Sequence, residues 1–357
     1  MARRWNAKWV GHGFEPGADI GVFGFRRKFE IVASPPQLLV NVSADQRYKL
    51  FVNGELVSWG PQRGEPRHWF FETVDLGPGL RPGANWLAAL VWNFGWMAPM
   101  AQTSTMRTAF VLEDLQGDHS LSTPHDWEVL KLENWRFAIM HRGVGEFYID
   151  VGPGEIMDAR GAPWGWRTGE DDQEGWRPAH VICQAEEREA HIGGTPWMLV
   201  ARAIPMMEYR MREKAPTIRN DYDAAPASRS TPTEEPSRLV LEERRESPDV
   251  SFVAQEALRA AIGEELPLDL GPKTSLLLDF GELICGYPRI ALTGPSGAEV
   301  TLTYDESLWM ADGTKGHRDE VAGKHPRGYQ DRFILDGNTR TFEPLWWRTW
   351  RYILIET

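Results

Sequence analysis

The stretch "RYKLFVNGELVSWG", residues 47–60, predicts a β-hairpin. Apolar and polar residues alternate on both sides of Asn53-Gly54, which is the pattern of a strand with one buried face. The Asn-Gly pair tolerates positive φ at both positions, as the type I′ turn of a two-residue hairpin requires. The hairpin therefore indicates antiparallel β structure in this part of the chain.

Similar short segments, rich in β-branched or aromatic residues and separated by turn residues, surround the hairpin and return near the carboxyl end. They are 23–31, 37–44, 69–76, 85–93, 107–115, 275–281, 287–294, 298–308, 330–337 and 350–356. Short, evenly spaced strands without intervening helices favour sandwiches and disfavour βαβ folds. We therefore expect an all-β protein with two jelly-roll or galactose-binding-like β-sandwich domains joined by a connector.

The domain boundaries follow from composition. Residues 216–239 combine Pro, Ser, Thr, Ala and charged residues with almost no large apolar side chain, which is typical of an exposed connector. We place the first sandwich at 1–215, the connector at 216–272 and the second sandwich at 273–357. Within the connector, helical spacing of apolar residues predicts a short helix over 250–265.

Length and charge exclude several classes of function. A chain of 357 residues needs more than one core. Its net charge of −12 disfavours nucleic acid as a partner. The longest apolar stretch, 86–100, is too short and too interrupted to cross a membrane. The arginines at positions 3 and 4 are not followed by an apolar segment, so we expect a cytoplasmic protein without a membrane partner.

Tryptophan is unusually frequent, with 17 residues. Flat aromatic rings beside amides and arginines are typical of sugar sites. The candidates that follow or end strands of the first sandwich are Trp59, Arg63, Trp69, Asn93 and Trp96. The alternative is that these indoles fill the cores.

The sequence identifies no catalytic residue. Asp305 and Glu306 are neighbours on a predicted strand, so their side chains point to opposite faces. Asp279 and Glu282 fit a turn at Gly281 better than a catalytic pair. Neither the acidic loop 168–176 nor the histidines at 317 and 325 have the spacing of a metal site, and we assign no metal and no cofactor.

The order of the motifs resembles the amino-terminal half of bacterial α-L-rhamnosidases over nearly the whole chain. The motifs are "FGFRRKFEI" (23–31), "VSADQRYKLFVNGELVSWGP" (42–61), "ETVDLGPGLRPGANWLAALV" (72–91), "GPGEIMDARGAPWGW" (152–166), "EGWRPAHVI" (174–182), "LLLDFGELICGYPRIALTGPSGAEVTLTYDESL" (276–308), "QDRFILDG" (330–337) and "FEPLWWRTWRYILIE" (342–356).

The resemblance implies a galactose-binding-type sandwich followed by a second sandwich of the concanavalin-like type. In that family an (α/α)₆ barrel comes next and carries the carboxylates of an inverting hydrolysis. None of the family's functional residues has a match here, because the chain ends at "RYILIET" (351–357), where the barrel would begin. The implied function is that of a non-catalytic, carbohydrate-associated region. Its implied partners are a rhamnose-containing glycan and a catalytic barrel in cis or in trans.

Two alternatives stay open. In the first alternative, the chain is a glycoside hydrolase that acts on α-L-rhamnosides, either with a separately supplied barrel or with its own active site. A convergent carboxylate pair beside exposed aromatic residues would support this alternative. In the second alternative, the chain is a structural or interaction module without sugar binding. An exposed apolar patch around Trp346, Trp347 and Trp350 would support this alternative.

Overall fold

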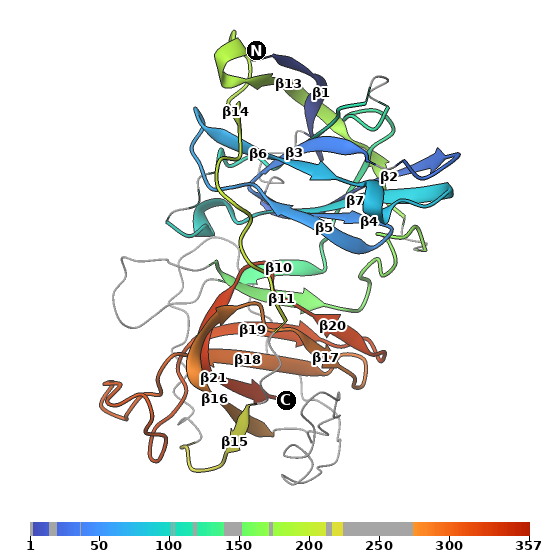
Figure 1. Cartoon of the computed structure of the whole chain (residues 1–357). Coiled ribbons are helices and arrows are strands. Elements are labelled where there is room, and N and C mark those ends of the chain that lie inside the picture. The colour runs from blue at the N-terminus through green and yellow to red at the C-terminus, as the bar shows by residue number, and fades with distance from the viewer. Residues whose placement is uncertain are drawn as a thin grey trace. The chain divides into compact units, whose positions relative to one another are not determined.

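The computed structural model describes ten parts of the chain, and these divide into two compact units (Figure 1). The described residues are 3–13, 20–35, 37–100, 102, 104–116, 120–138, 152–170, 174–211, 216–223 and 274–357. Unit 1 contains Met1–Trp135 and Ala162–Met207, and unit 2 contains Arg136–Gly161 and Glu208–Thr357. Apart from short 3₁₀ turns at Gly77–Gly79, Gly95–Met97 and Arg188–Ala190, the regular structure of the described residues is β. The expected all-β class is confirmed.

Unit 1 contains two six-stranded layers, one of which closes into a barrel. The barrel order is β1 (Arg4–Gly11), β13 (His180–Glu187), β14 (Met198–Ala201), β6 (Trp69–Asp75), β3 (Leu39–Asp45) and β8 (Ala109–Asp114). The open sheet has the order β12 (Arg177–Pro178), β9 (Glu128–Lys131), β2 (Gly21–Ile31), β7 (Gly83–Asn93), β4 (Arg47–Val52) and β5 (Glu55–Gly60).

The predicted hairpin is strands β4 and β5, and its turn has the expected geometry. Asn53 and Gly54 both have positive φ, at 50° and 88°. The Asn53 side chain also accepts a hydrogen bond from Trp86 N (2.9 Å) and donates to Asn85 Oδ1 (2.9 Å). The turn residue therefore fixes the hairpin against β7 as well as reversing the chain.

Period-2 alternation gives unit 1 two apolar cores. Alternate residues of β3 and β8, such as Val42 and Phe110, pack against the open sheet, where Phe25 lies 5.2 Å from Phe110 between ring centroids. The intervening residues face the barrel interior, which is filled by an aromatic cluster. That cluster contains Trp5, Trp9, Trp69, Phe71 and Trp197.

The tryptophan-rich stretch after Gly161 lies on the other face of the open sheet. Trp166 and Trp176 lie so close to Gly24 on β2 that a Cβ there would meet both rings, at 3.2 and 3.0 Å. Gly169 lies directly against the Trp86 ring, since a Cβ at this glycine would be 2.2 Å from it. The stretch therefore packs as part of unit 1.

Unit 2 is built on a seven-stranded sheet. Its order is β10 (Trp135–Ala138), β11 (Gly154–Asp158), β19 (Tyr329–Ile334), β18 (Glu299–Asp305), β21 (Arg348–Glu356), β16 (Ser275–Gly286) and β15 (Thr217–Arg219). A separate pair joins β17 (Ile290–Leu292) to β20 (Arg340–Phe342).

The units differ from the expected domains in two respects. Residues 136–161, placed in the first sandwich by the sequence, belong to unit 2 because β11 pairs in parallel with β19. Thr217–Arg219, placed in the connector, is a strand that pairs with β16. The helix expected at 250–265 lies outside the described residues.

The exposed apolar patch required by the interaction-module alternative is not present at the carboxyl end. Trp346 and Trp350 are 1% and 5% exposed, and Trp347 is half-buried and stacked on Trp346 at 4.1 Å. Trp350 lies on the last strand, which is central in its sheet and buried on both faces, and Trp346 is buried just before that strand.

Candidate functional site

Strand register brings four of the five predicted sugar residues to one edge of the open sheet. Arg47, the first residue of β4, pairs with Trp92 on β7, and the next residue of β4 pairs with Gly60 on β5. The ends of β5 and β7 therefore flank the start of β4. Trp59 and Arg63 lie on the β5 side, and Asn93 and Trp96 lie on the β7 side. We call residues 45–47, 61–63, 93–97 and 104–106 the edge site.

The fifth candidate, Trp69, lies elsewhere. It is 3% exposed inside the barrel, and its Nε1 donates to the carbonyl of Ala44 at 3.2 Å. Its strand, β6, pairs with β3 and with β14, so the side chain is enclosed by the barrel. Trp69 is a core residue and has no surface from which to contact a sugar.

Asp45, which the sequence suggested as an ion-pair partner of Arg47 rather than as a ligand, fixes the centre of the edge site. Its carboxylate accepts hydrogen bonds from Thr105 Oγ1 (2.7 Å), Thr105 N (3.0 Å), Trp197 Nε1 (3.0 Å) and Ser104 Oγ (3.2 Å). Burial raises the pKa of Asp45 to about 6, against the opposing effect of these donors. Asp45 thus ties the 104–106 loop to an indole of the barrel interior.

Two buried amides beside Asp45 have donors to spare. Gln46 Oε1 accepts from Phe94 N (3.0 Å), and Asn93 Oδ1 accepts from Gly95 N (2.8 Å) and Ser104 Oγ (3.2 Å). Gln46 Nε2 and Asn93 Nδ2 are buried and have no acceptor among the described residues. Buried amide donors normally bind an acceptor, which can be an ordered water or a ligand hydroxyl.

The β5 side of the edge site is held rigidly. Glu72 accepts from Tyr48 Oη (2.8 Å), Gln62 N (2.8 Å) and Arg202 Nη1 (3.0 Å). Arg47 Nη1 donates to the Pro61 carbonyl at 2.6 Å. The exposed Arg63 therefore projects from a fixed loop.

The β7 side of the edge site presents an apolar surface. Trp96 is 61% exposed in the 3₁₀ turn whose first residue, Gly95, donates to Asn93 Oδ1, and Met106 is 45% exposed. Both residues adjoin Gly95, since a Cβ placed there would be 3.3 Å from Met106 Cε. An exposed indole with buried amides in the same loop has the composition of a sugar site.

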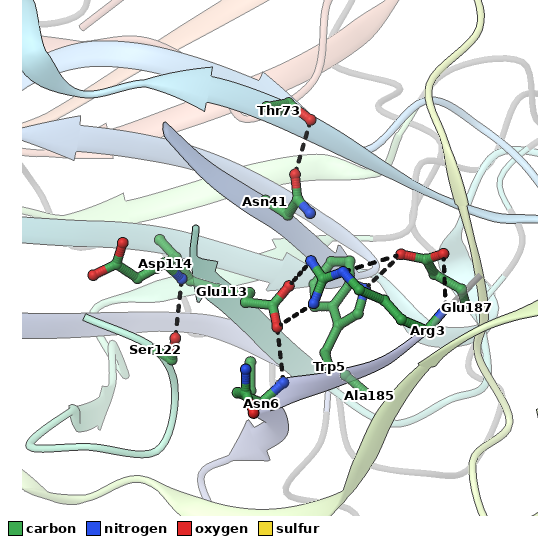
Figure 2. Close-up of polar contacts among 12 residues, drawn as sticks. Arg3, Trp5, Asn6, Asn41, Thr73, Glu113, Asp114, Ser122, Ala185 and Glu187 are labelled. Carbon is green, nitrogen blue, oxygen red and sulfur yellow. Dashed lines mark hydrogen bonds and ion pairs between the residues drawn. The ribbon is translucent and has the colours of Figure 1, made fainter. Parts of the chain in front are cut away.

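A catalytic site for glycoside cleavage would need a pair of carboxyl groups, one as the acid and the other as the base or nucleophile. Figure 2 shows Arg3 between Glu113 and Glu187 in unit 1. Arg3 forms a forked contact with Glu113 at 2.8 and 2.5 Å, and Glu187 Oε1 accepts from Trp5 Nε1 at 3.2 Å. Glu113 is fully buried and also accepts from Asn6 N at 2.8 Å, so it has no access to a substrate.

The carboxylates of unit 2 are paired in the same way. Arg348 binds Asp331 at 2.6 Å and Glu155 at 3.3 Å, and all three side chains are at most 1% exposed. Asp279 accepts from Gly281 N (2.8 Å), which confirms its predicted turn role, and pairs with Arg351 at 3.0 Å.

Asp45 and Asp305 are the two described carboxyls with a clearly raised pKa. Burial raises the pKa of Asp305 to about 7, and its Oδ2 accepts from Arg327 N at 2.5 Å. The two residues belong to different units. The carboxylate beside Asp305 is that of its chain neighbour Glu306, whose charge also raises the pKa of Asp305. Side chains of adjacent strand residues point to opposite faces, so the two do not flank one bond as an acid–base pair would.

The described part of the chain contains no group of three metal-ligating side chains, although Asp171 and Asp172 of the acidic loop lie outside it. None of its helices is long and apolar enough to span a membrane.

Comparison with known families identifies the carboxyl-terminal part of the chain. Residues 270–357 match the bacterial alpha-L-rhamnosidase concanavalin-like domain. A search of curated proteins found no match.

Solved structures with a similar fold are rhamnosidases. A GH78 rhamnosidase of Bacillus sp. GL1 superposes with a TM-score of 0.63 at 18% identity, over 99% of this chain and 53% of its own. The α-L-rhamnosidase of Aspergillus terreus gives 0.54 at 17% identity, over 98% of this chain and 34% of its own. The α-L-rhamnosidase of Streptomyces avermitilis, solved in complex with L-rhamnose, gives a TM-score of 0.50 at 20% identity, over 94% of this chain and 27% of its own. The chain thus spans about half or less of these proteins, and the resemblance seen in the sequence is confirmed at the level of fold.

Proposed function

We propose that this chain is the non-catalytic, carbohydrate-associated region of an α-L-rhamnosidase-like glycoside hydrolase. The observation that carries the proposal is the family match over residues 270–357. The fold of the chain also resembles that of a solved rhamnosidase over 99% of the chain, while it covers only 53% of that rhamnosidase. Four buried carboxylates of the described residues support it, because arginines already pair with Glu72, Glu113, Asp279 and Asp331.

The ligand in this proposal is a rhamnose-containing glycan, and the partner is a catalytic barrel in the same polypeptide or in another chain. The edge site is the proposed sugar contact. Trp96 would pack on the apolar face of a pyranose, and the buried amides of Asn93 and Gln46 would reach its hydroxyls through ordered water. Arg63 and Trp59 would border the site on the β5 side.

Two measurements test the proposal. The purified chain should not release the aryl group from an aryl α-L-rhamnoside, and turnover that survives further purification would favour the enzyme alternative instead. A rhamnose-containing oligosaccharide should change the NMR signals of the Trp96 indole on titration.

The matched variants are Trp96→Ala and Ile192→Ala, both at exposed apolar positions of unit 1. Loss of the indole should weaken binding about five- to tenfold, the effect of about 1–1.5 kcal/mol of ring stacking. Ile192→Ala should bind as the unmodified chain does. Absence of both turnover and binding would favour a structural module.

A further inference from the structure

The loop that follows β18 in unit 2, residues 306–328, carries a second aromatic surface residue with an unusual electrostatic environment. Lys315 Nζ lies 4.8 Å from the centroid of the Trp309 ring, and Arg327 Cζ lies 5.4 Å from it. Trp309 and Lys315 are half-buried and Arg327 is exposed, so solvent reaches the group.

The two cations have no counter-ion at contact distance. Among the described residues, no carboxylate lies within 4.0 Å of Lys315 Nζ or of the Arg327 guanidinium, whereas Arg340, Arg348 and Arg351 in the same unit are all ion-paired. The buried Asp305 carboxylate accepts from the main-chain N–H of Arg327 at 2.5 Å and attracts Lys315 from beyond contact distance, which offsets part of the positive charge. With two cations beside one ring and no carboxylate in contact with either, an anion from solution would be attracted to them.

The loop is held in place by its own hydrogen bonds. Trp309 and His325 exchange two main-chain bonds, of 2.9 and 2.8 Å, in an isolated bridge. Lys324 Nζ, nearly buried, donates to the carbonyl of His317 at 2.8 Å and contacts Glu320 at 3.2 Å. The cations are therefore presented by a preorganised loop, which lowers the entropy lost on binding.

The same loop holds a buried hydroxyl. Ser307 is 6% exposed, and its Oγ has no hydrogen-bond partner among the described residues. It lies two residues before Trp309. The group therefore combines an aromatic face, two cations and an unused hydroxyl.

We propose that Trp309, Lys315 and Arg327 form a binding site for a pyranose that carries a carboxylate, which is a uronic acid residue of a glycan. A guanidinium binds a carboxylate through two parallel hydrogen bonds, and a lysine adds a second charge. The indole contributes contact with the ring of the sugar. The expectation of a sugar rests on the proposed carbohydrate role of the chain, and the expectation of a carboxylate rests on the two cations beside Trp309 alone.

The test is a titration of the full chain with methyl glucuronide and with methyl glucoside, followed by NMR of the tryptophan indoles. The glucuronide should bind and shift the Trp309 signal, and the glucoside should bind at least about tenfold more weakly. Raising the salt from about 20 to about 200 mM should weaken glucuronide binding several-fold, because the charges are exposed to solvent.

Three variants locate the site. Arg327→Ala and Lys315→Ala should each weaken glucuronide binding about fivefold or more, and Arg289→Ala, at an exposed arginine of the same unit, should leave it unchanged. Equal binding of glucoside and glucuronide would overturn the charge preference. Equal competition by acetate would overturn the sugar part. Loss of rhamnoside binding in Trp96→Ala with glucuronide binding retained would show the two sites to be separate.

Discussion

Replacing Arg348 by alanine removes the cation from the most buried charge cluster of unit 2. The guanidinium donates from Nε to Asp331 (2.9 Å), and from Nη2 to Asp331 (2.6 Å) and to the Pro153 carbonyl (2.9 Å). Glu155 in turn accepts from the main-chain N–H of Leu345 at 2.8 Å. The cluster thus connects β11, β19 and β21 with the segment that leads into β21.

The expected loss follows from what Arg348→Ala leaves behind. Asp331 and Glu155, at 0% and 1% exposure, would keep their negative charges without a cation, and removing one partner of a buried pair costs about 3–5 kcal/mol. With a urea slope of about 2 kcal/mol/M, the unfolding midpoint of unit 2 should fall by about 2 M. The triple variant Arg348→Met, Glu155→Gln, Asp331→Asn should recover most of the stability, because it removes all the charges together.

Urea unfolding followed by near-ultraviolet circular dichroism measures the effect, with each transition fitted separately because the chain has two units. The control is Arg332→Ala, because the half-exposed contact of Arg332 with Glu299 at 3.8 Å should contribute less than about 1 kcal/mol. If Arg348→Ala costs no more than this control, the cluster does not stabilise the unit and the argument fails.

Two further predictions concern unit 1. Burial raises the pKa of Asp45 from 3.8 to about 6, so its contribution to the free energy of unfolding is full below about pH 4 and is lost as the pH rises through 6, by about 3 kcal/mol in all. Urea unfolding measured across this pH range should show a smaller pH dependence of stability for Asp45→Asn than for the unmodified chain. The same pH dependence in both would contradict the raised pKa of Asp45. Gly169→Ala should lower the thermal unfolding midpoint far more than Gly193→Ala. Both glycines have positive φ (75° and 100°), but only a Cβ at residue 169 would meet the Trp86 ring, at 2.2 Å. Equal midpoints of the two variants would show that the Trp86 ring moves freely.

Local patterns predicted the strands that alternate cleanly. The segments expected at 23–31, 69–76 and 330–337 correspond to β2, β6 and β19 within a few residues. Strand β1 was missed although Trp5, Ala7 and Trp9 alternate with polar residues, a signal that was present in the sequence. Most of β9 to β14 are short strands whose pairing partners lie far away in the chain, and local alternation is weak in such strands.

The candidate site shows the same limit. Trp59, Arg63, Asn93 and Trp96 were chosen because each follows or ends a strand, but the sequence could not show that β4 lies between them. The expected ion pair of Asp45 with Arg47 did not indicate the hydrogen bonds that Asp45 and Gln46 form, because these depend on loops about 50–60 residues away in the chain.

The sequence by itself determined the hairpin at Asn53-Gly54 and the all-β character, because turn geometry and side-chain alternation are properties of neighbouring residues. Only the tertiary structure decided which tryptophans are core and which are surface. Trp69 and Trp96 both adjoin strands of unit 1, yet closure of the barrel by residues 4–11 and 180–201 buries the first and leaves the second exposed. That closure depends on pairing between segments more than 150 residues apart, such as Lys8 with Gln184, and long-range pairing has no local signature.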